Sequence, residues 1–448
     1  MSYEVSGFAD ANEQFHARGL TDGLPIIPPT PDRVAAFLEA AGLEAGAQIG
    51  FYHERRMPVL AEKLAINAVM AGCLPEYFPV VVAIVDAMLD PAFPIHVANS
   101  STGSFTLGFI VNGPVRRQLG MNCDGNVLGP GNRANSTIGR AIRLIQMNVL
   151  GSVAGAGAPD AGHGRAVLDR SMMGQPAKYA GYHIVENEEL FPSLLPVHVE
   201  MGYAPEDSTV TLMMIAGYHW ICAHGEQTPE AWTDTMAHYI VHTGMLHESG
   251  YGVLLLPPEN AHLFASAGWT KADIREALFA KTRRSVAWVK QQGWKLSWQR
   301  ERFEPVQPGD EDRMMAMAGS SSPEDLIIAV CGGPAGSWPY YLYGGGGAAR
   351  PIVRRIAVTR PGDAMSRIDA ALSGARSQLR ADGYDLTVRP DGSGGLRTTI
   401  SAGPDACPDC LVPKSMMAAQ FANALQAAGI APIPSVQLIY PGEGKPDK

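Results

Sequence analysis

The apolar residues of the chain follow two spacings, one typical of amphipathic helices and one typical of buried strands. Helical spacing occurs in four long segments, at residues 61–89, 136–150, 228–243 and 271–283. Short apolar runs that predict buried strands occur in three places, at residues 108–111, 251–256 and 325–331. Strands that alternate with helices are typical of an α/β body, and we expect a largely parallel sheet.

The order of these elements recurs in two parts of the chain. In each part a helix is followed by a strand, a proline-containing turn, a short helix and a longer helix, and the turns lie at residues 112–114 and 257–259. The residue types at matching positions scarcely agree, so the repeat is degenerate. The pattern therefore predicts an α/β body of two degenerate repeated halves, with a ligand site in the cleft between them.

Glycine and proline divide the chain into three predicted segments. Residues 1–60 form an N-terminal arm in which Thr30 and Pro31 open a helix. Residues 61–354 form the α/β body with its glycine-rich loops, and residues 355–448 carry a strand and helix pattern typical of a small α+β domain. A chain of 448 residues is too long for one hydrophobic core, which agrees with this division.

The charge of the chain narrows its expected partners. The net charge is −9 and the basic residues form no extended run, so nucleic acid is not an expected partner. The N-terminal residues lack the apolar core of a signal peptide, and the most apolar stretches, at residues 80–89 and 144–153, are too short to cross a bilayer. We therefore expect a cytoplasmic protein that does not contact a membrane.

Two of the six cysteines, Cys407 and Cys410, are close enough in sequence to share one ligand. A Cys-x-x-Cys pair places two thiolates within reach of one metal ion, and Pro413 predicts that a helix begins shortly afterwards. The pair can equally serve as a redox dithiol or as two structural thiols. Because two thiolates fill only half of a tetrahedral shell, a metal site would need a second copy of the chain or body cysteines such as Cys123.

The segment around this pair resembles a known family. Residues 380–386 read Arg-Ala-Asp-Gly-Tyr-Asp-Leu, residues 391–395 read Asp-Gly-Ser-Gly-Gly, and Cys407-Pro-Asp-Cys410 precedes a predicted helix. Over residues 364–441 this arrangement resembles NifU-like iron–sulfur scaffold domains. The resemblance implies that Cys407 and Cys410 are cluster ligands shared between the two subunits of a homodimer.

The body resembles an uncharacterised bacterial protein family in residues 65–79 and 129–140. The second stretch belongs to a glycine-rich loop, residues 120–135, that leads into a helix. Because a helix N-terminus attracts anions, we expect a small anionic substrate there, and the alternative is a tight loop with an ordinary helix cap. The candidate substrate-binding residues of this loop and helix are Asn122, Asn132, Arg133, Asn135 and Arg140.

A second glycine-rich loop follows the strand predicted at residues 325–331. Open α/β sheets bind ligands at the carboxyl ends of their strands, so this loop is a second candidate for substrate binding. The alternative is a flexible surface hairpin. Its candidate substrate-binding residues are Gly332, Gly333 and Ser337.

Candidate catalytic residues are dispersed along the body. Cys123 and Cys73 are candidates for a nucleophile or for additional metal ligands, and His183 or Glu186 is a candidate general base. The structural alternative for a cysteine is a small buried apolar residue. His238 and His242 lie one helical turn apart but lack the glutamate of a metalloprotease motif. The sequence leaves open the roles of Cys73, Cys222 and Cys331.

Together these features predict a metal- or iron–sulfur-dependent enzyme of the lyase or hydratase type that acts on a small anionic organic substrate. We expect its cofactor to be an iron–sulfur cluster or a single iron or zinc ion, acting as Lewis acid or electron carrier. One alternative is an iron–sulfur or sulfur carrier whose body binds a client protein. The other is a thiol–disulfide oxidoreductase that uses Cys407 and Cys410.

Overall fold

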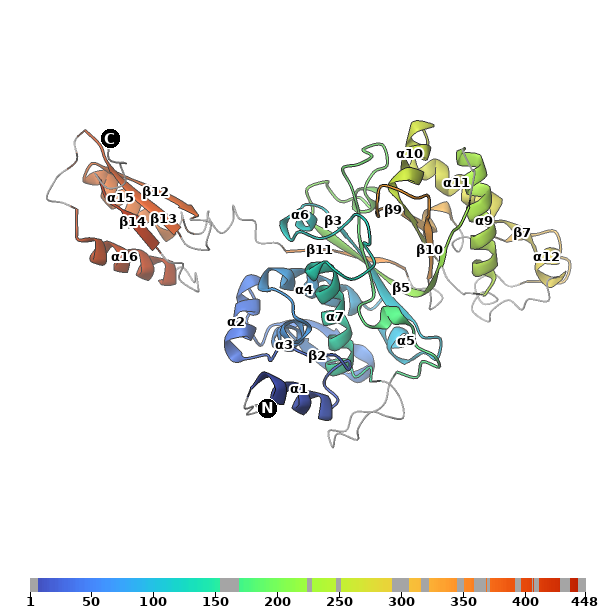
Figure 1. Ribbon diagram of the computed structural model, residues 1–448, viewed down its shortest axis with the longest axis horizontal. Coiled ribbons are helices and arrows are strands. Elements are labelled where there is room, and N and C mark those ends of the chain that lie inside the picture. Colours follow the sequence, from blue (N-terminus) through green and yellow to red (C-terminus); the bar gives the residue numbers. More distant parts are fainter. Residues whose placement is uncertain are drawn as a thin grey trace. The chain divides into compact units, whose positions relative to one another are not determined.

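The chain forms two compact units in the computed structural model, Met1–Val358 and Thr359–Lys448 (Figure 1). The structure describes residues 7–153, 169–223, 228–246, 251–291, 306–315, 322–344, 350–357, 368, 371–390, 396–404, 406, 411–427 and 436–441. The first unit contains the predicted N-terminal arm together with the α/β body. The second corresponds to the predicted α+β domain, and the boundary follows Val358 rather than residue 354.

A mixed sheet lies at the centre of the first unit. Six strands follow the order β4-β3-β5-β10-β6-β9, and β11 also pairs with β5. The strands are β3 (Thr106–Asn112), β4 (Tyr182–Val185), β5 (Thr209–Trp220), β6 (Gly252–Leu256), β9 (Leu326–Val330), β10 (Tyr340–Gly344) and β11 (Ile352–Arg355). Because β11 is hydrogen-bonded to β5, residues 352–355 belong to the body, which explains the later boundary.

The expectation of a largely parallel sheet was wrong. Among the described strands of this sheet, only the outer pairs, β3–β4 and β6–β9, are parallel. The pairs β3–β5, β5–β10, β10–β6 and β5–β11 are antiparallel. The difference comes from β5 and β10, which the sequence analysis did not predict and which occupy the middle of the sheet.

The two halves of the sheet have the same connectivity. In the first half β3 leads by a crossover to its parallel neighbour β4, and the chain then returns in β5, antiparallel to β3. In the second half β6 leads to its parallel neighbour β9 and the chain returns in β10, antiparallel to β6. The two returning strands pair with each other at the centre. The sheet order is therefore symmetric about the β5–β10 pair.

The sheet also curls, so that its two outermost strands meet at their carboxyl ends. The strands β4 and β9 stand at opposite ends of the strand order. The backbone N–H of Asn187, just after β4, nevertheless donates to the carbonyl of Val330 at the end of β9, at 2.7 Å. The glycine-rich loop between β3 and β4 and the one between β9 and β10 also meet here, at the bridge between Asp124 and Gly332.

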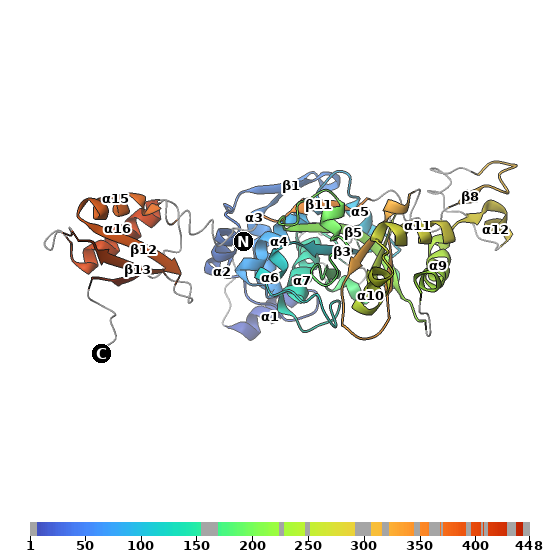
Figure 2. The ribbon, with the colours of Figure 1, turned by 90° about the horizontal axis from the view of Figure 1, so that it is seen from above.

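Helices pack beside each half and bury separate apolar clusters (Figures 1 and 2). The helices of the first half are α3 (Ala61–Ala71), α4 (Phe78–Met88), α5 (Ile95–Ser100), α6 (Val115–Gln118), α7 (Arg133–Asn148) and α8 (Val197–Glu200). Those of the second half are α9 (Pro229–Leu246), α10 (Pro258–Ser266), α11 (Lys271–Lys281) and α12 (Val286–Gln291). Among the described residues, no helix has the length and apolar character needed to cross a membrane.

The N-terminal arm packs into the main core of the first unit. It comprises the helices α1 (Phe8–Ala17) and α2 (Pro31–Ala40) and a hairpin of β1 (Gln48–Tyr52) and β2 (Met57–Leu60). Phe15, Ile26 and Val34 belong to the same buried apolar cluster as the helices α3, α4 and α7. The arm is therefore a structural part of the body.

The second unit is a small α+β fold, as the sequence predicted. Its strands lie in the order β12 (Tyr384–Pro390), β13 (Leu396–Ala402) and β14 (Val436–Ile439), and its helices are α15 (Ser373–Ala381) and α16 (Lys414–Ala427). Leu386, Ile400 and Phe421 are buried in a core of its own. Cys407 and Cys410 lie outside the described residues.

Candidate functional site

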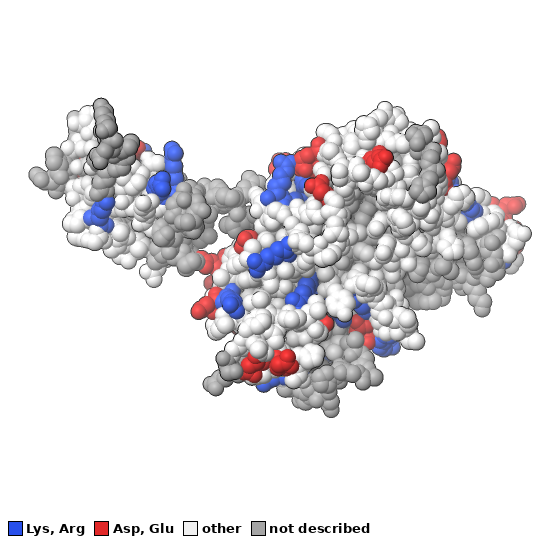
Figure 3. Space-filling view, viewed as in Figure 1, with Lys and Arg blue, Asp and Glu red and all other residues white. Residues whose placement is uncertain are grey.

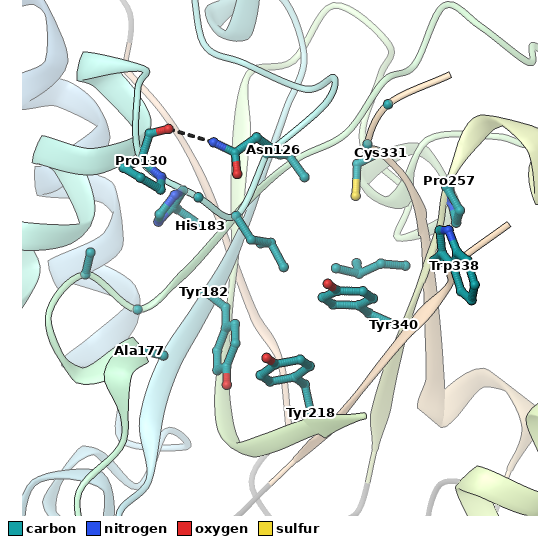
Figure 4. A pocket seen from close by; sticks show the side chains of 18 of the residues that line it. Asn126, Pro130, Ala177, Tyr182, His183, Tyr218, Pro257, Cys331, Trp338 and Tyr340 are labelled. Carbon is teal, nitrogen blue, oxygen red and sulfur yellow. Dashed lines mark hydrogen bonds between the residues drawn. The ribbon is translucent and has the colours of Figure 1, made fainter. Parts of the chain in front are cut away.

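A cavity of about 740 Å³ lies between the two predicted glycine-rich loops (Figure 4). Residues 126–130 form one side, and Cys331 with the glycines that follow it forms the other. Among the described residues that line it there is no Asp, Glu, Lys or Arg. The cavity is therefore uncharged, and its chemistry comes from a thiol, an imidazole, hydroxyls and aromatic rings.

A short bridge fixes the two loops against each other. Asp124 and Gly332 form an isolated parallel β-bridge, and the Gly332 N–H donates to the carbonyl of Cys123 at 2.9 Å. Gly332 has φ = 103°, a backbone conformation that favours glycine. A Cβ atom at Gly333 would lie 3.2 Å from the Cα of Gly125. The two glycines predicted to bind substrate both line the cavity, and they also permit the close approach of the loops.

Three predicted substrate-binding asparagines build the first loop instead of lining the cavity. Asn132 caps α7, because its side chain accepts a hydrogen bond from the Asn135 N–H at 3.1 Å. The buried Asn135 side chain accepts from the Asn122 N–H at 3.1 Å and donates to the Asn122 carbonyl at 2.9 Å. A second bond from Asn135 reaches the carbonyl of Val127. These bonds hold the backbone of residues 122–135 in place.

The two predicted arginines bind other parts of the protein and do not line the cavity. Arg133 donates to the carbonyl of Gly72 at 3.0 Å. Arg140 makes two hydrogen bonds of 2.8 Å to the carboxylate of Asp22, which ties α7 to the N-terminal arm. Ser337 is not a lining residue either, although its neighbours Gly336 and Trp338 are. In Figure 3, acidic and basic side chains are interspersed over the face shown.

His183 and Cys331 lie on either side of the cavity (Figure 4). His183 is 5% exposed, and neither ring nitrogen has a hydrogen-bond partner among the described residues. Burial lowers the pKa of His183 below its usual 6.5, and nearby backbone groups of Ala180 and Gly129 offset only part of this effect. Its imidazole is therefore neutral at pH 7.

Cys331 directly follows β9, and its surroundings keep its thiol protonated. It is 4% exposed, and burial raises the pKa of its thiol well above the usual range. The nearby Glu186 and Cys123 raise this pKa further, whereas Lys271 lowers it. The Cys331 thiol therefore keeps its proton at pH 7. The sequence alone had assigned this residue no role.

Glu186 belongs to a buried charged cluster outside the cavity lining. Its carboxylate accepts hydrogen bonds from Lys271 at 2.8 Å, from Asn112 at 2.7 Å and from the Val197 N–H at 2.8 Å. The Val330 N–H adds a longer contact of 3.4 Å. These donors come from both halves of the sheet, so Glu186 joins the halves. Its lone pairs are occupied, which makes it a structural residue rather than a free general base.

Aromatic side chains form another part of the cavity, and the sequence analysis missed most of them. Tyr218 and Tyr340 stack with ring centroids 5.3 Å apart, and Tyr182 meets Tyr218 edge to face. Trp338 also lines the cavity and packs against Trp220 at 4.9 Å. Tyr218 and Trp220 stand on β5. The alternation of Gly217-Tyr-His-Trp220 after an apolar run is the sequence signal that marks this strand.

The remaining candidates lie outside the cavity. Cys123 is half-buried, and burial together with Asp124 raises the pKa of its thiol while Arg116 lowers it. His238 and His242 lie on exposed positions of α9. Within the described ranges, no group of three or more His, Cys, Asp or Glu side chains is arranged to hold a metal ion.

A scan of the chain against protein-family models and searches of curated proteins and of solved structures find no match.

Proposed function

We propose that the body is an enzyme of the lyase or hydratase type that acts on a small organic substrate in the cavity. The observation that carries the proposal is the placement of one imidazole and one thiol on either side of an uncharged cavity. Addition and elimination of water need a base that removes a proton next to a carbonyl and an acid that protonates the leaving hydroxyl. An unprotonated imidazole and a protonated thiol are the resting forms that a base and an acid need for this chemistry.

In this proposal His183 is the base and Cys331 is the acid. Burial keeps the His183 imidazole neutral and the Cys331 thiol protonated, which is the state that each group needs before reaction. After elimination the proton lies on His183 and Cys331 is a thiolate, so one proton must return from His183 to Cys331 to complete the cycle. Water or product can carry that proton through the cavity.

The lining supports a flat, unsaturated substrate with few charges. The stacked rings of Tyr218 and Tyr340 offer an apolar surface against which a planar group packs. The arginines proposed from the sequence to hold an anion are engaged elsewhere, by Asp22 and by the Gly72 carbonyl. An anionic group of the substrate would therefore depend on the N-terminus of α7, near Ser136, for its binding.

Solvent exchange tests this proposal on several classes of substrate at once. The full chain is incubated in deuterated water with a panel of 2-oxo acids, aryl hydroxy acids and unsaturated acids, and loss of the C–H signal is followed by NMR. We expect exchange with at least one class, its loss in His183→Ala and its strong reduction in Cys331→Ala. The matched control Cys222→Ser should exchange like the parent. Exchange that survives in both cavity variants would contradict the assignment.

We also propose that Cys407 and Cys410 hold an iron–sulfur cluster or a single iron or zinc ion in a homodimer. Two thiolates are donors that suit each of these groups, and a second copy of the pair would complete the shell. When bound, the group would supply Lewis-acid or electron-transfer chemistry. The α+β fold of the second unit is compatible with the NifU-like resemblance and supports this proposal.

We infer that the body arose by internal duplication. The support is the sheet order, in which the strands β4, β3 and β5 match β9, β6 and β10 in connectivity and direction. Under this relation the residue after β4, Glu186, corresponds to the residue after β9, Cys331. One half has thus kept a charged structural residue at the position where the other carries the cavity thiol.

A further inference from the structure

Two cysteines far apart in the sequence lie side by side next to the cavity. Asp124 and Gly332 form a parallel bridge, and each is preceded directly by a cysteine, Cys123 or Cys331. The carbonyl of Cys123 accepts the N–H of Gly332 at 2.9 Å. Both cysteines are free thiols in this structure. The bridge therefore fixes the two cysteines in register on neighbouring segments.

This pairing brings the backbones of the two cysteines to a spacing at which a disulfide can form. Neighbouring paired segments lie about 4.8 Å apart, and residues in register point to the same face. A disulfide needs Cα atoms separated by about 4.4–6.8 Å, so little backbone movement is required. The glycines Gly332 and Gly333 allow the close approach. The electrostatic influence of Cys123 on the Cys331 thiol agrees with their proximity.

The two thiols differ in access. Cys123 is half-buried, so its thiol is partly accessible to solvent, although burial and Asp124 raise its pKa and the Arg116 guanidinium offsets only part of this effect. Cys331 is buried and is reached through the cavity. A small oxidant therefore meets Cys123 first, and Cys331 is placed to react with the product.

We propose that Cys123 and Cys331 form a reversible disulfide site that small-molecule disulfides oxidise. The Cys123 thiol first loses its proton to solvent, and its sulfur then attacks the oxidant RSSR, forms a mixed disulfide and releases one thiolate RS⁻. The Cys331 thiol then loses its proton to solvent, and its sulfur attacks the Cys123 sulfur and expels a second RS⁻, which the released protons convert to RSH. Two protein S–H bonds are lost, one S–S bond forms, and RSSR is reduced to two RSH molecules.

Oxidation would change the cavity directly. It removes the only thiol among the described lining residues, and it locks the loop of residues 122–135 to the loop of residues 331–338. If Cys331 is the acid of the proposed function, the oxidised protein loses that activity, and a dithiol reductant restores it. The thiol pair does not depend on the proposed function, because its test measures covalent mass.

The test uses the full chain with Cys407→Ser and Cys410→Ser, so that only the four body cysteines remain. The protein is treated with oxidised glutathione, alkylated, and analysed by intact mass and peptide mapping. We expect alkylatable thiols to fall from four to two, with one cross-linked peptide that joins Cys123 to Cys331. Dithiothreitol should restore all four.

Single variants define the order of reaction. Cys331→Ser should stop at a mixed disulfide that carries one glutathione on Cys123, and Cys123→Ser should leave Cys331 reduced. Cys222→Ser is the matched control and should form the same cross-link as the parent. Thermal unfolding of each variant checks its fold, and a serine variant that does not fold is replaced by the alanine variant of the same cysteine. Four reactive thiols after treatment, or a cross-link through Cys73 or Cys222, would overturn the proposal.

Discussion

At the scale of single residues, the first unit combines an uncharged cavity with a buried charged cluster. Glu186 and Lys271 are each 1% exposed and lie 2.8 Å apart. Arg116, also buried, donates to the carbonyl of Glu186 at 2.6 Å and pairs with Glu188 and Glu189. Removing two charges from water costs several kcal/mol each, so the pair is stable only while both partners and their hydrogen bonds are present.

Replacement of Lys271 should therefore destabilise the body strongly. Lys271→Met leaves the Glu186 carboxylate buried without its counter-charge, and we expect the free energy of unfolding to fall by about 3–5 kcal/mol. Denaturant titration of the first unit measures this loss of unfolding free energy. Lys290→Met, which removes a surface pair with Glu311, should change stability little. A loss in the double variant Lys271→Met/Glu186→Gln as large as in Lys271→Met would contradict this account.

His183 should make stability depend on pH. Its pKa is lowered in the folded protein by burial, so between that value and about 6.5 the unfolded chain binds more protons. The contribution of His183 is therefore fully present above its unfolded pKa and is lost as the pH falls toward the folded pKa. We expect unfolding free energy to drop between about pH 7.5 and about pH 5.5, and to drop less in His183→Gln. If the unfolding free energy of His183→Gln falls with pH as steeply as that of the parent, His183 is not the cause of the pH dependence.

At the scale of elements, helices and short buried strands could be predicted, and the centre of the sheet could not. The apolar spacing identified α3, α4, α9 and α11, and the structure shows that Thr270 caps α11. In contrast, β5 mixes an apolar start with an alternating aromatic end, and β10 reads as a glycine-flanked loop. The residues that line the cavity could not be predicted from local sequence patterns either, because Cys331 and His183 come together only when β4 and β9 meet.

The start of α7 shows how a local feature shapes the cavity. The sequence placed the helix start at residue 136, whereas Asn132 is the cap and α7 begins at Arg133. Asn132→Ala should lower stability by about 1 kcal/mol and loosen the loop beside the cavity. We therefore expect Cys331 to react several-fold faster with iodoacetamide. Thr270→Ala, at the cap of α11, should cost similar stability and leave that rate unchanged.

At the scale of the whole molecule, two units with separate cores share one chain. The second unit should fold alone, because its strands and helices bury their own apolar cluster. Expression of residues 359–448 should give a cooperative unfolding transition and, after anaerobic purification, bound iron or zinc. Cys407→Ser and Cys410→Ser should each abolish the bound metal without unfolding the domain.

Metal stoichiometry with native mass distinguishes the modes of binding. One metal centre per dimer of the fragment supports sharing between two copies of Cys407 and Cys410. Metal that binds only when the first unit is added supports ligands from body cysteines. One complete site in each isolated monomer would exclude both. Full metal content in the double serine variant would remove the proposal altogether.

The contact between the ends of β4 and β9 also affects the tendency of the protein to aggregate. The outermost strands of a sheet carry unpaired backbone groups that can recruit strands of other molecules. Here those strands are short, and their carboxyl ends are tied together by the bond between Asn187 and Val330 and by the Glu186 carboxylate. In a variant that loses these hydrogen bonds, β4 and β9 would separate. Both edge strands would then be exposed to other molecules, while most of the core would remain packed. Such a variant should aggregate before it unfolds.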